Sequence, residues 1–390
     1  MHNKKIYILT TICLIALLLS GCNNNPAKGK DPANKSAEKS PILLNAEIAD
    51  AKFSFLDDKV VWIGLNVDKQ DSPSTLLFSS SDHGQTWSST QLDDYSIVSM
   101  QFVDREHGWA IGNVKSQSAE KAYCILATQD GGNNWVKKYE TLQASRISPC
   151  QIQFLNTNDG FARFNNELLS TTDGGESWKQ IWSIEDLMSV DFKDNKEGWA
   201  SSRNSIWHTI DGGNTWNKEW SVPENIKKRL EPISSKVIIN STSEGWALFS
   251  SEGTMSQSSK IVLHKDQSNH WTIESGYYMA EPSFSRNPAP SEAGDLFPIS
   301  GTSAFLIAYT PSTYPVTVLK TNDQGKTWSK IMNESKPKGF PVMLPGDLAR
   351  INFVNEQLGW GVIVNTSQSN KLNIVRTEDG GANWRTILQK

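Results

Sequence analysis

A short phrase that runs from Ser or Thr through Asp and Gly to Trp recurs along this chain of 390 residues. A complete copy reads Thr128-Gln-Asp130-Gly131-Gly132-Asn-Asn-Trp135. A degenerate seventh copy runs from His264 to Trp271 around Asp266. The six complete copies contain Asp82 and Trp87, Asp130 and Trp135, Asp173 and Trp178, Asp211 and Trp216, Asp323 and Trp328, and Asp379 and Trp384. Seven copies predict seven similar structural units.

A second phrase precedes each copy and centres on an aromatic residue, usually Gly-Trp, after an earlier Phe or Ile. Phe102 followed by Gly108-Trp109-Ala110 is a clear example, whereas Phe55 with Trp62 is a weaker one. The seven Asp residues of the first phrase recur every 38 to 57 residues. Repeats of this length with several short strands predict a seven-bladed β-propeller, an all-β fold of four-stranded antiparallel blades.

The chemistry of the turn explains its residues. A tight hairpin turn requires a positive φ, which Gly adopts at little steric cost. The Asp carboxylate can accept hydrogen bonds from backbone N–H groups across the turn, and the Ser or Thr hydroxyl can add another. The Trp then covers the hairpin and packs between neighbouring sheets. We therefore interpret the Asp and Trp residues of these six turns as structural, since nothing in the turn requires a ligand.

The first phrase resembles the Asp-box, or bacterial neuraminidase repeat. Together with the phrase around Gly-Trp-Ala, it makes residues 45–390 similar to the photosystem II stability/assembly factor family of seven-bladed propellers. The resemblance implies the propeller fold and a role in the assembly of membrane-associated proteins. It says little about the client, because the repeated residues form the scaffold.

The N-terminus predicts a lipoprotein. Lys4 and Lys5 precede an apolar run from Ile6 to Leu19, which is about as long as the core of a signal peptide and short for a membrane span. The run ends on Ser20-Gly21-Cys22, which resembles a bacterial lipobox. We expect a signal peptide over 1–21, a lipid-modified Cys22 with a polar flexible tether over 22–40, and the propeller over 41–390. The expected location is the membrane surface outside the cytoplasm, in a leaflet that the sequence does not specify.

The composition argues against one class of partner, nucleic acids. The formal net charge is −4, and no basic cluster indicates a nucleic-acid site. Beyond Cys13 and Cys22 only Cys124 and Cys150 remain, and in an exported protein they form either a disulfide or two buried thiols. We expect a monomer without a cofactor.

The connections that differ between blades indicate the binding face. The turns between strands 1 and 2 and between strands 3 and 4 lie on one face of a propeller and repeat, whereas the other connections vary. Three long variable stretches, between 276 and 298, 309 and 316, and 333 and 348, are rich in proline, aromatic residues and Arg. The candidate partner-binding residues are Tyr277, Tyr278, Phe284, Arg286, Tyr309, Tyr314 and Phe340. Alternatively, these side chains fold back onto the propeller.

The sequence favours a binding protein over an enzyme. A sialidase requires three arginines around the substrate carboxylate and a Tyr–Glu nucleophile pair, but Arg105, Arg376 and Arg385 lie in or beside the repeated turns. No nucleophile elbow, zinc motif or calcium loop is present. We expect no catalytic residue and no metal site. Glycan binding is the alternative to protein binding. The sequence does not decide how the ring closes. Either blade 7 packs against blade 1 without a shared strand, or residues 42–48 add an outer strand to the last blade.

Overall fold

The computed structural model describes residues 47–69, 72–114, 121–143, 150–230, 232, 234–240, 244–251, 259–277, 294–308, 317–331, 339–341, 348–365 and 371–390. The chain divides into two units, Met1–Leu43 and Leu44–Lys390, and every described residue belongs to the second. Cys22 lies outside the described residues. Within the described residues, no helix combines the length and apolar character that a bilayer crossing requires.

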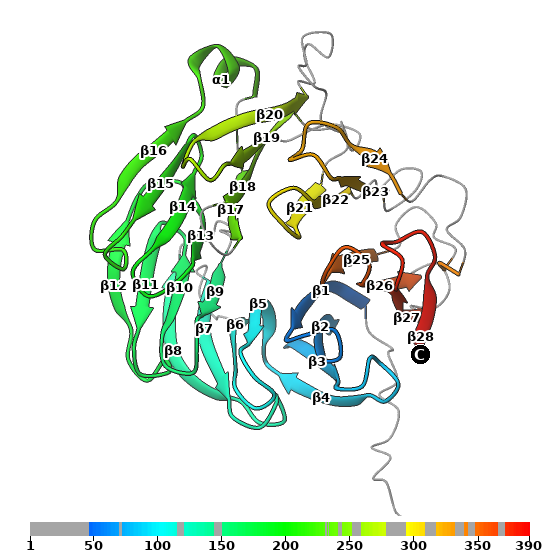
Figure 1. Ribbon diagram of the computed structural model, residues 1–390. Helices are drawn as coiled ribbons and strands as arrows, with labels where there is room; N and C mark the ends of the chain where they lie inside the picture. Colours follow the sequence, from blue (N-terminus) through cyan, green and yellow to red (C-terminus); the bar gives the residue numbers. More distant parts are fainter. Residues whose placement is uncertain are drawn as a thin grey trace, which may run out of the picture. The chain divides into compact units, whose positions relative to one another are not determined.

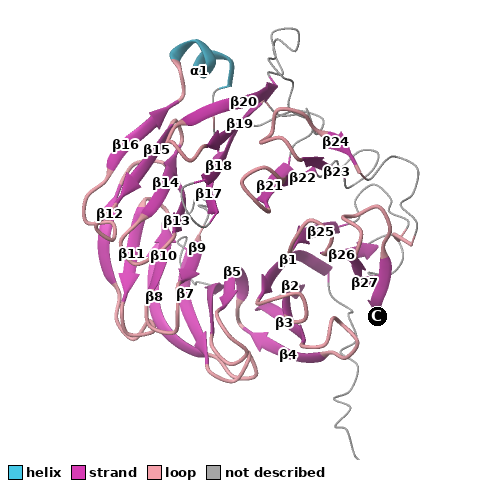
Figure 2. Cartoon of the chain, viewed as in Figure 1, coloured by secondary structure: helices cyan, strands magenta, loops and turns pink. Residues whose placement is uncertain are grey.

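The prediction of a seven-bladed propeller is confirmed, because the strands form seven separate four-stranded antiparallel sheets (Figures 1 and 2). Each sheet consists of four consecutive strands in the order in which the chain makes them. Blade 1 contains β1 (Glu47–Phe55), β2 (Val61–Lys69), β3 (Ser72–Ser80) and β4 (Ser88–Asp93).

The other blades repeat this plan. Blade 2 contains β5 (Ser96–Phe102), β6 (Gly108–Val114), β7 (Lys121–Thr128) and β8 (Val136–Gln143). Blade 3 contains β9 (Gln151–Phe154), β10 (Gly160–Phe164), β11 (Glu167–Thr171) and β12 (Lys179–Ser183). Blade 4 contains β13 (Leu187–Phe192), β14 (Gly198–Ser202), β15 (Ser205–Thr209) and β16 (Asn217–Ser221).

A short helix, α1 (Glu224–Leu230), leads from blade 4 to blade 5. Blade 5 contains β17 (Ser234–Asn240), β18 (Glu244–Ser250), β19 (Lys260–Lys265) and β20 (Trp271–Tyr277). Blade 6 contains β21 (Gly294–Pro298), β22 (Ala304–Ala308), β23 (Thr317–Thr321) and β24 (Ser329–Lys330). Blade 7 contains β25 (Leu348–Phe353), β26 (Gly359–Asn365), β27 (Lys371–Thr377) and β28 (Arg385–Gln389).

The ring closes by packing between blade 7 and blade 1. The first strands of the blades surround the centre, and β1 contacts both β5 and β25 (Figure 1). At the closing seam, Arg350 Nε lies 2.8 Å from Asp50 Oδ1, and the rings of Trp87 and Trp360 meet edge to face. Ile48 pairs with Val67 inside blade 1, so this part of the segment 42–48 does not add an outer strand to blade 7.

Aromatic stacking between blades forms much of the core. At four of the seams between described blades, the aromatic residue on the second strand of one blade stacks on the Phe that ends the first strand of the next blade. Ring centroids are 4.0 Å apart for Trp62 and Phe102, and 3.6 Å apart for Trp109 and Phe154. The glycine before the aromatic residue permits this approach, because a Cβ atom on Gly108 would lie 2.5 Å from the Phe102 ring.

The two cysteines lie on opposite faces of blade 2. Cys124 is fully buried in the cluster that faces blade 1, whereas Cys150 packs with the side chains between blades 2 and 3. Since a sheet separates the two side chains, a disulfide does not form in this structure, and both residues are thiols. Burial raises the pKa of each thiol to about 11.

Candidate functional site

In the turns of the first phrase, the Asp carboxylate accepts hydrogen bonds from residues of the same turn. In blade 2, Asp130 Oδ1 accepts hydrogen bonds from Thr128 Oγ1 and Asn134 N, each at 2.9 Å, and Asp130 Oδ2 accepts one from Asn134 Nδ2 at 2.7 Å. The Trp135 indole then donates to Gly132 O at 3.1 Å. Blades 1, 4, 6 and 7 repeat this set, and blade 3 repeats its carboxylate bonds.

These hydrogen bonds keep the carboxylates ionised. In blade 3, the hydrogen bonds from the Ser177 hydroxyl and backbone lower the pKa of Asp173 to about 2. A carboxylate with so low a pKa is a poor general acid or base near neutral pH. The Asp residues of the turns therefore act as structural acceptors.

Six of the seven turns also hold two successive residues at positive φ, whereas the turn of blade 5 has a single one, Asn269. Gly131 and Gly132 have φ of 72° and 95°. Where the sequence keeps one glycine, His83 and Gln324 adopt the left-handed region, with φ of 62° and 66°. A residue with a Cβ atom is strained there, at a cost of roughly 1–2 kcal/mol.

The contact between blades 4 and 5 differs from the contacts between the other blades described below, because the degenerate turn of blade 5 has no glycine pair. At regular seams, the indole Nε1 of Trp62 donates to Gly131 O and that of Trp109 to Gly174 O, across to the next blade. In blade 5, Lys265 takes the place of the Ser or Thr that begins the turn, since it lies opposite Gly245 in the sheet as Thr209 lies opposite Gly198. The acceptor for the blade-4 indole must therefore come from elsewhere.

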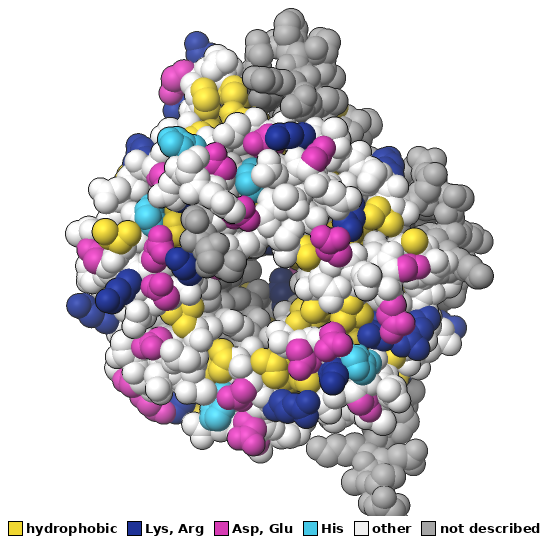
Figure 3. Space-filling model, in the orientation of Figure 1, with side chains coloured by type: hydrophobic (Ala, Val, Ile, Leu, Met, Phe, Trp, Pro, Cys, Tyr) yellow, Lys and Arg dark blue, Asp and Glu magenta, His cyan; other side chains and the backbone are white. Residues whose placement is uncertain are grey.

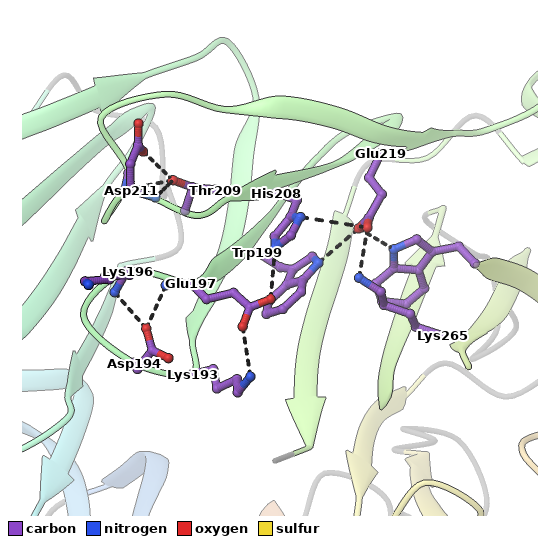
Figure 4. Close-up of polar contacts among 12 residues, drawn as sticks. Lys193, Asp194, Lys196, Glu197, Trp199, His208, Thr209, Asp211, Glu219 and Lys265 are labelled. Atoms are coloured by element: carbon purple, nitrogen blue, oxygen red, sulfur yellow. Dashed lines mark hydrogen bonds and ion pairs between the residues drawn. The ribbon is translucent and has the colours of Figure 1, made fainter. Parts of the chain in front are cut away.

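Glu219 of β16 supplies that acceptor (Figure 4). Its Oε2 atom accepts hydrogen bonds from the indoles of Trp199 and Trp271, each at 2.9 Å. Its Oε1 atom lies 2.9 Å from Nζ of Lys265, whose side chain is fully buried. Burial lowers the pKa of Lys265, while the carboxylate of Glu219 opposes that shift. We call these four residues together with His208 the Glu219 cluster.

His208 completes the Glu219 cluster on its outer side. Its ring stacks on Trp199 with centroids 4.3 Å apart, and its Nε2 atom lies 3.3 Å from Glu197 Oε1. Burial lowers the pKa of His208, so the neutral form prevails at neutral pH. Both carboxylate oxygens of Glu219 face groups of the chain itself, so the cluster connects two blades rather than presenting a nucleophile or a general base.

The innermost strands are joined by side chains that reach across to the neighbouring backbone. Gln153 bonds both the N–H and the C=O of Phe192, each at 2.9 Å. Asp191 accepts from Ile239 N at 2.7 Å and from Gln153 Nε2 at 2.9 Å. Burial raises the pKa of Asp191 to about 6. These bonds cover the inner edges of the sheets around the central hollow that Figure 3 shows.

Arg163 on β10 is a buried cation that the sequence did not reveal. Its Nη1 atom donates to Leu187 O at 3.0 Å and to Asn165 O at 3.3 Å, and no ion pair joins it to a described carboxylate. Burial lowers the pKa of Arg163 to about 10. The Phe-Ala-Arg-Phe sequence alone gave no signal that this arginine is inside the protein.

Of the candidate partner-binding residues, the structure describes Tyr277 and Phe340. Tyr277 ends β20 and packs, half-buried, on the cluster around Trp246. Phe340 meets Trp384 edge to face with ring centroids 5.4 Å apart. Both therefore contact the propeller, in the manner of the fold-back alternative. The other candidates, Tyr278, Phe284, Arg286, Tyr309 and Tyr314, lie outside the described residues.

The described residues bear on two kinds of binding site, a metal site and a charged patch. Among the described residues, no group of three or more His, Cys, Asp or Glu side chains has metal-binding geometry. On the face that Figure 3 shows, acidic and basic side chains are interspersed.

Comparisons with known proteins agree with the fold. A family model described as Photosynthesis system II assembly factor YCF48 matches residues 79–186. A solved structure of YCF48 bound to D1 peptide is 17% identical, with a TM-score of 0.51, and the match covers 86% of this chain and 94% of that chain. YCF48 from Cyanidioschyzon merolae is 16% identical, with a TM-score of 0.51, and the match covers 87% and 95%.

A propeller from another class of protein matches as well. The β-propeller domain of the Trilobed protease from Pyrococcus furiosus, described as having an open velcro topology, is 7% identical with a TM-score of 0.53. That match covers 88% of this chain and 96% of that chain. No curated protein matches the sequence significantly. At these identities the solved structures support the fold.

Proposed function

We propose that this chain is a non-catalytic binding scaffold, anchored to the outside of a bacterial membrane through lipid on Cys22, that holds a segment of another envelope protein during its assembly. The family match over residues 79–186 supports this role, as does the similar propeller that carries a bound D1 peptide.

The observation that carries the proposal is the internal use of the acidic groups. The Asp carboxylates of the turns accept hydrogen bonds from their own hairpins, and Glu219 binds two indoles and an ammonium group of its own chain. Acids held in this way stabilise a rigid ring rather than transfer protons. A rigid ring with variable connections on one face is suited to binding.

The client is expected at the candidate residues between blade 5 and blade 6. The test is photo-crosslinking in the native host, followed by mass spectrometry of the captured proteins. The variant replaces Tyr278, Phe284 and Arg286 together with Ser, Ser and Gln. The control replaces Val136 and Ile210 with Ser, because both are exposed apolar residues on blades 2 and 4.

We expect one envelope protein to crosslink to wild type and to the control, and to be lost from the loop variant. Identical capture by both variants, or capture of no protein by any of them, would refute the client site. Anchoring is tested separately with Cys22→Ser, which should abolish incorporation of labelled fatty acid and release the protein from the membrane fraction.

A further inference from the structure

The ion pair between Lys265 and Glu219 is more buried than the other Lys and Arg ion pairs of the described residues. Its side chains are 0% and 18% exposed, whereas those of Lys236 and Asp295 are 36% and 45% exposed. Nζ of Lys265 lies 4.4 Å from the centroid of the Trp199 ring and 2.9 Å from Glu219 Oε1. The amine therefore touches a carboxylate at a point that bulk water does not reach.

A β-bulge directs the Glu219 side chain across the seam between blades 4 and 5. The pairing of β15 with β16 shifts in register between Ile206 and Trp207, and Glu219 is the extra residue on β16. A bulge of this kind re-aims a side chain out of the regular alternation of a strand. The carboxylate reaches Lys265, the last residue of β19, which lies 46 positions further along the chain. The two groups therefore meet only in the folded protein.

The two oxygens of the Glu219 carboxylate have different neighbours. Oε1 lies against the amine of Lys265, whereas Oε2 accepts the indole N–H groups of Trp199 and Trp271, each at 2.9 Å (Figure 4). Two fixed N–H donors on one oxygen are the arrangement that stabilises the oxyanion formed when a nucleophile attacks a carboxyl carbon. The site therefore favours attack by the amine, with the charge on Oε2 and with Oε1 as the oxygen that leaves.

The burial of the pair also favours the reactive form of the amine. Burial lowers the pKa of Lys265, although the carboxylate of Glu219 opposes that shift. Transfer of one proton from Nζ to Oε1 converts the ion pair into a neutral amine and a neutral carboxylic acid, which removes two charges from a site that solvates them poorly. A lysine amine that is desolvated in this way is a nucleophile.

We propose that Lys265 and Glu219 form an amide bond, so that blades 4 and 5 are covalently joined at the seam that lacks a glycine turn. Neither group is offered to an outside substrate, because both belong to the Glu219 cluster. Since folding holds the two groups together, the reaction is unimolecular. This modification does not depend on the client or on the membrane anchor.

The bond forms with the loss of one water molecule. Nζ of Lys265 attacks the carboxyl carbon of Glu219, and the two indoles stabilise the charge that develops on Oε2. The bond between that carbon and Oε1 then breaks. Oε1 receives two protons from Nζ in all and leaves as water, while Nζ keeps one hydrogen as the amide N–H. His208, whose Nδ1 atom lies 3.9 Å from Oε1, is placed to carry the second proton. No oxidant or further reactant is consumed.

Peptide mapping of the full-length protein by mass spectrometry tests the bond. After denaturation and digestion with trypsin, we expect a branched peptide that joins the segment containing Glu219 to the segment containing Lys265. Its mass should be lower by one water molecule than the sum of the two segments, and trypsin should not cleave after Lys265. The pair of Lys236 and Asp295, also 2.9 Å apart but exposed, is the internal control and should stay unlinked.

Substitutions test the assigned roles, with folding checked by near-UV circular dichroism. Lys265→Arg keeps a cation but removes the amine, and should give no branched peptide. Trp271→Phe keeps a ring but removes one donor to Oε2, and should slow bond formation roughly a hundredfold, measured at intervals after cell-free synthesis. Trp216→Phe is the matched control, because the Trp216 indole donates to Gly213 O within its own turn. It should leave the rate unchanged.

The wild-type map alone decides the proposal. Recovery of Glu219 and Lys265 on separate, unmodified peptides from the folded protein would overturn it. A branch from Lys265 to any other acid would do the same. A branched peptide that forms at the wild-type rate in Trp271→Phe would refute the role given to the indoles.

Discussion

Trp199 of blade 4 donates its indole hydrogen to Glu219 of the same blade at 2.9 Å, whereas Trp62 and Trp109 donate theirs to a backbone carbonyl of the next blade. The difference arises because blade 5 lacks the glycine turn that supplies the carbonyl in blades 2 and 3. Glu219 thus replaces a missing main-chain acceptor, and the stability of the seam depends on it.

Glu219→Ala should strongly destabilise the protein. It leaves two indole N–H groups and the buried ammonium of Lys265 without their acceptor, at a cost of about 3 kcal/mol in unfolding free energy. Urea unfolding measures the change. The control is Glu176→Ala, which removes a surface ion pair with Lys138 and should cost less than about 1 kcal/mol. Equal effects of the two substitutions would show that the Glu219 cluster is not structural.

Gly108→Ala should lower stability by about 1–3 kcal/mol, because the new Cβ atom would lie 2.5 Å from the Phe102 ring that stacks on Trp62. Gly64→Ala is the matched control on the second strand of blade 1, where the nearest atom to a Cβ is 3.4 Å away. Thermal unfolding of the two variants provides the comparison. A larger loss in the control would contradict the role assigned to the close approach.

Gln324→Gly should stabilise the protein by about 1 kcal/mol, since Gln324 adopts a φ of 66° and glycine relieves that strain. Its backbone N–H bond to Thr302 O is retained. The control is Glu176→Gly: Glu176 follows the glycine pair in blade 3 and does not have a positive φ, so this change should be neutral or destabilising. Denaturant midpoints distinguish the two, and a midpoint for Gln324→Gly at or below that of wild type would refute the prediction.

Asp191 should make stability fall as pH rises. Its pKa is raised by burial to about 6 from an ordinary value of 3.8, so the folded state binds this proton more tightly than the unfolded state. The resulting stabilisation is complete below about pH 4 and is lost as the pH rises through about 6. Asp191→Asn removes this titration. The unfolding free energy of wild type minus that of the variant should therefore decrease by up to about 3 kcal/mol between about pH 4 and pH 7. A constant difference would show that Asp191 has the same pKa in both states.

Cys124 and Cys150 should react slowly with alkylating reagents in the native protein near neutral pH, because burial raises the pKa of both thiols to about 11 and the thiolate is the reactive form. Mass spectrometry without reduction should find both alkylated after unfolding in denaturant. A mass that corresponds to a disulfide would contradict the placement of the two side chains on opposite faces of blade 2.

The repeated part of this fold could be predicted from sequence because its determinants are local. The turn from Thr128 to Trp135 holds its donors, acceptors and glycines within eight residues, so its pattern is visible in the chain. The number of blades follows from counting such turns.

The remainder depends on contacts that sequence spacing does not encode. Glu219 meets Trp271 across 52 positions, and no repeated phrase marks it. Gly108 belongs to a repeated phrase, but the reason for a glycine there is the close approach of the Phe102 ring, which the phrase does not encode. Tyr277 and Phe340 were predicted as partner-binding residues from their loop context, which did not reveal that both also contact the propeller.

Among the described residues, no blade takes a strand from another, since every sheet consists of four consecutive strands. A duplication or deletion of one repeat would therefore add or remove a complete hydrogen-bonded sheet and leave the remaining ladders intact. The same arrangement allows new termini to be placed between any two blades by circular permutation, so the order of the blades can change while each blade keeps its own pairing. Such a chain can change one blade at a time, and the turn of blade 5, which has no glycine pair and is supported by Glu219 of blade 4, shows that the ring accommodates a blade that differs from the others.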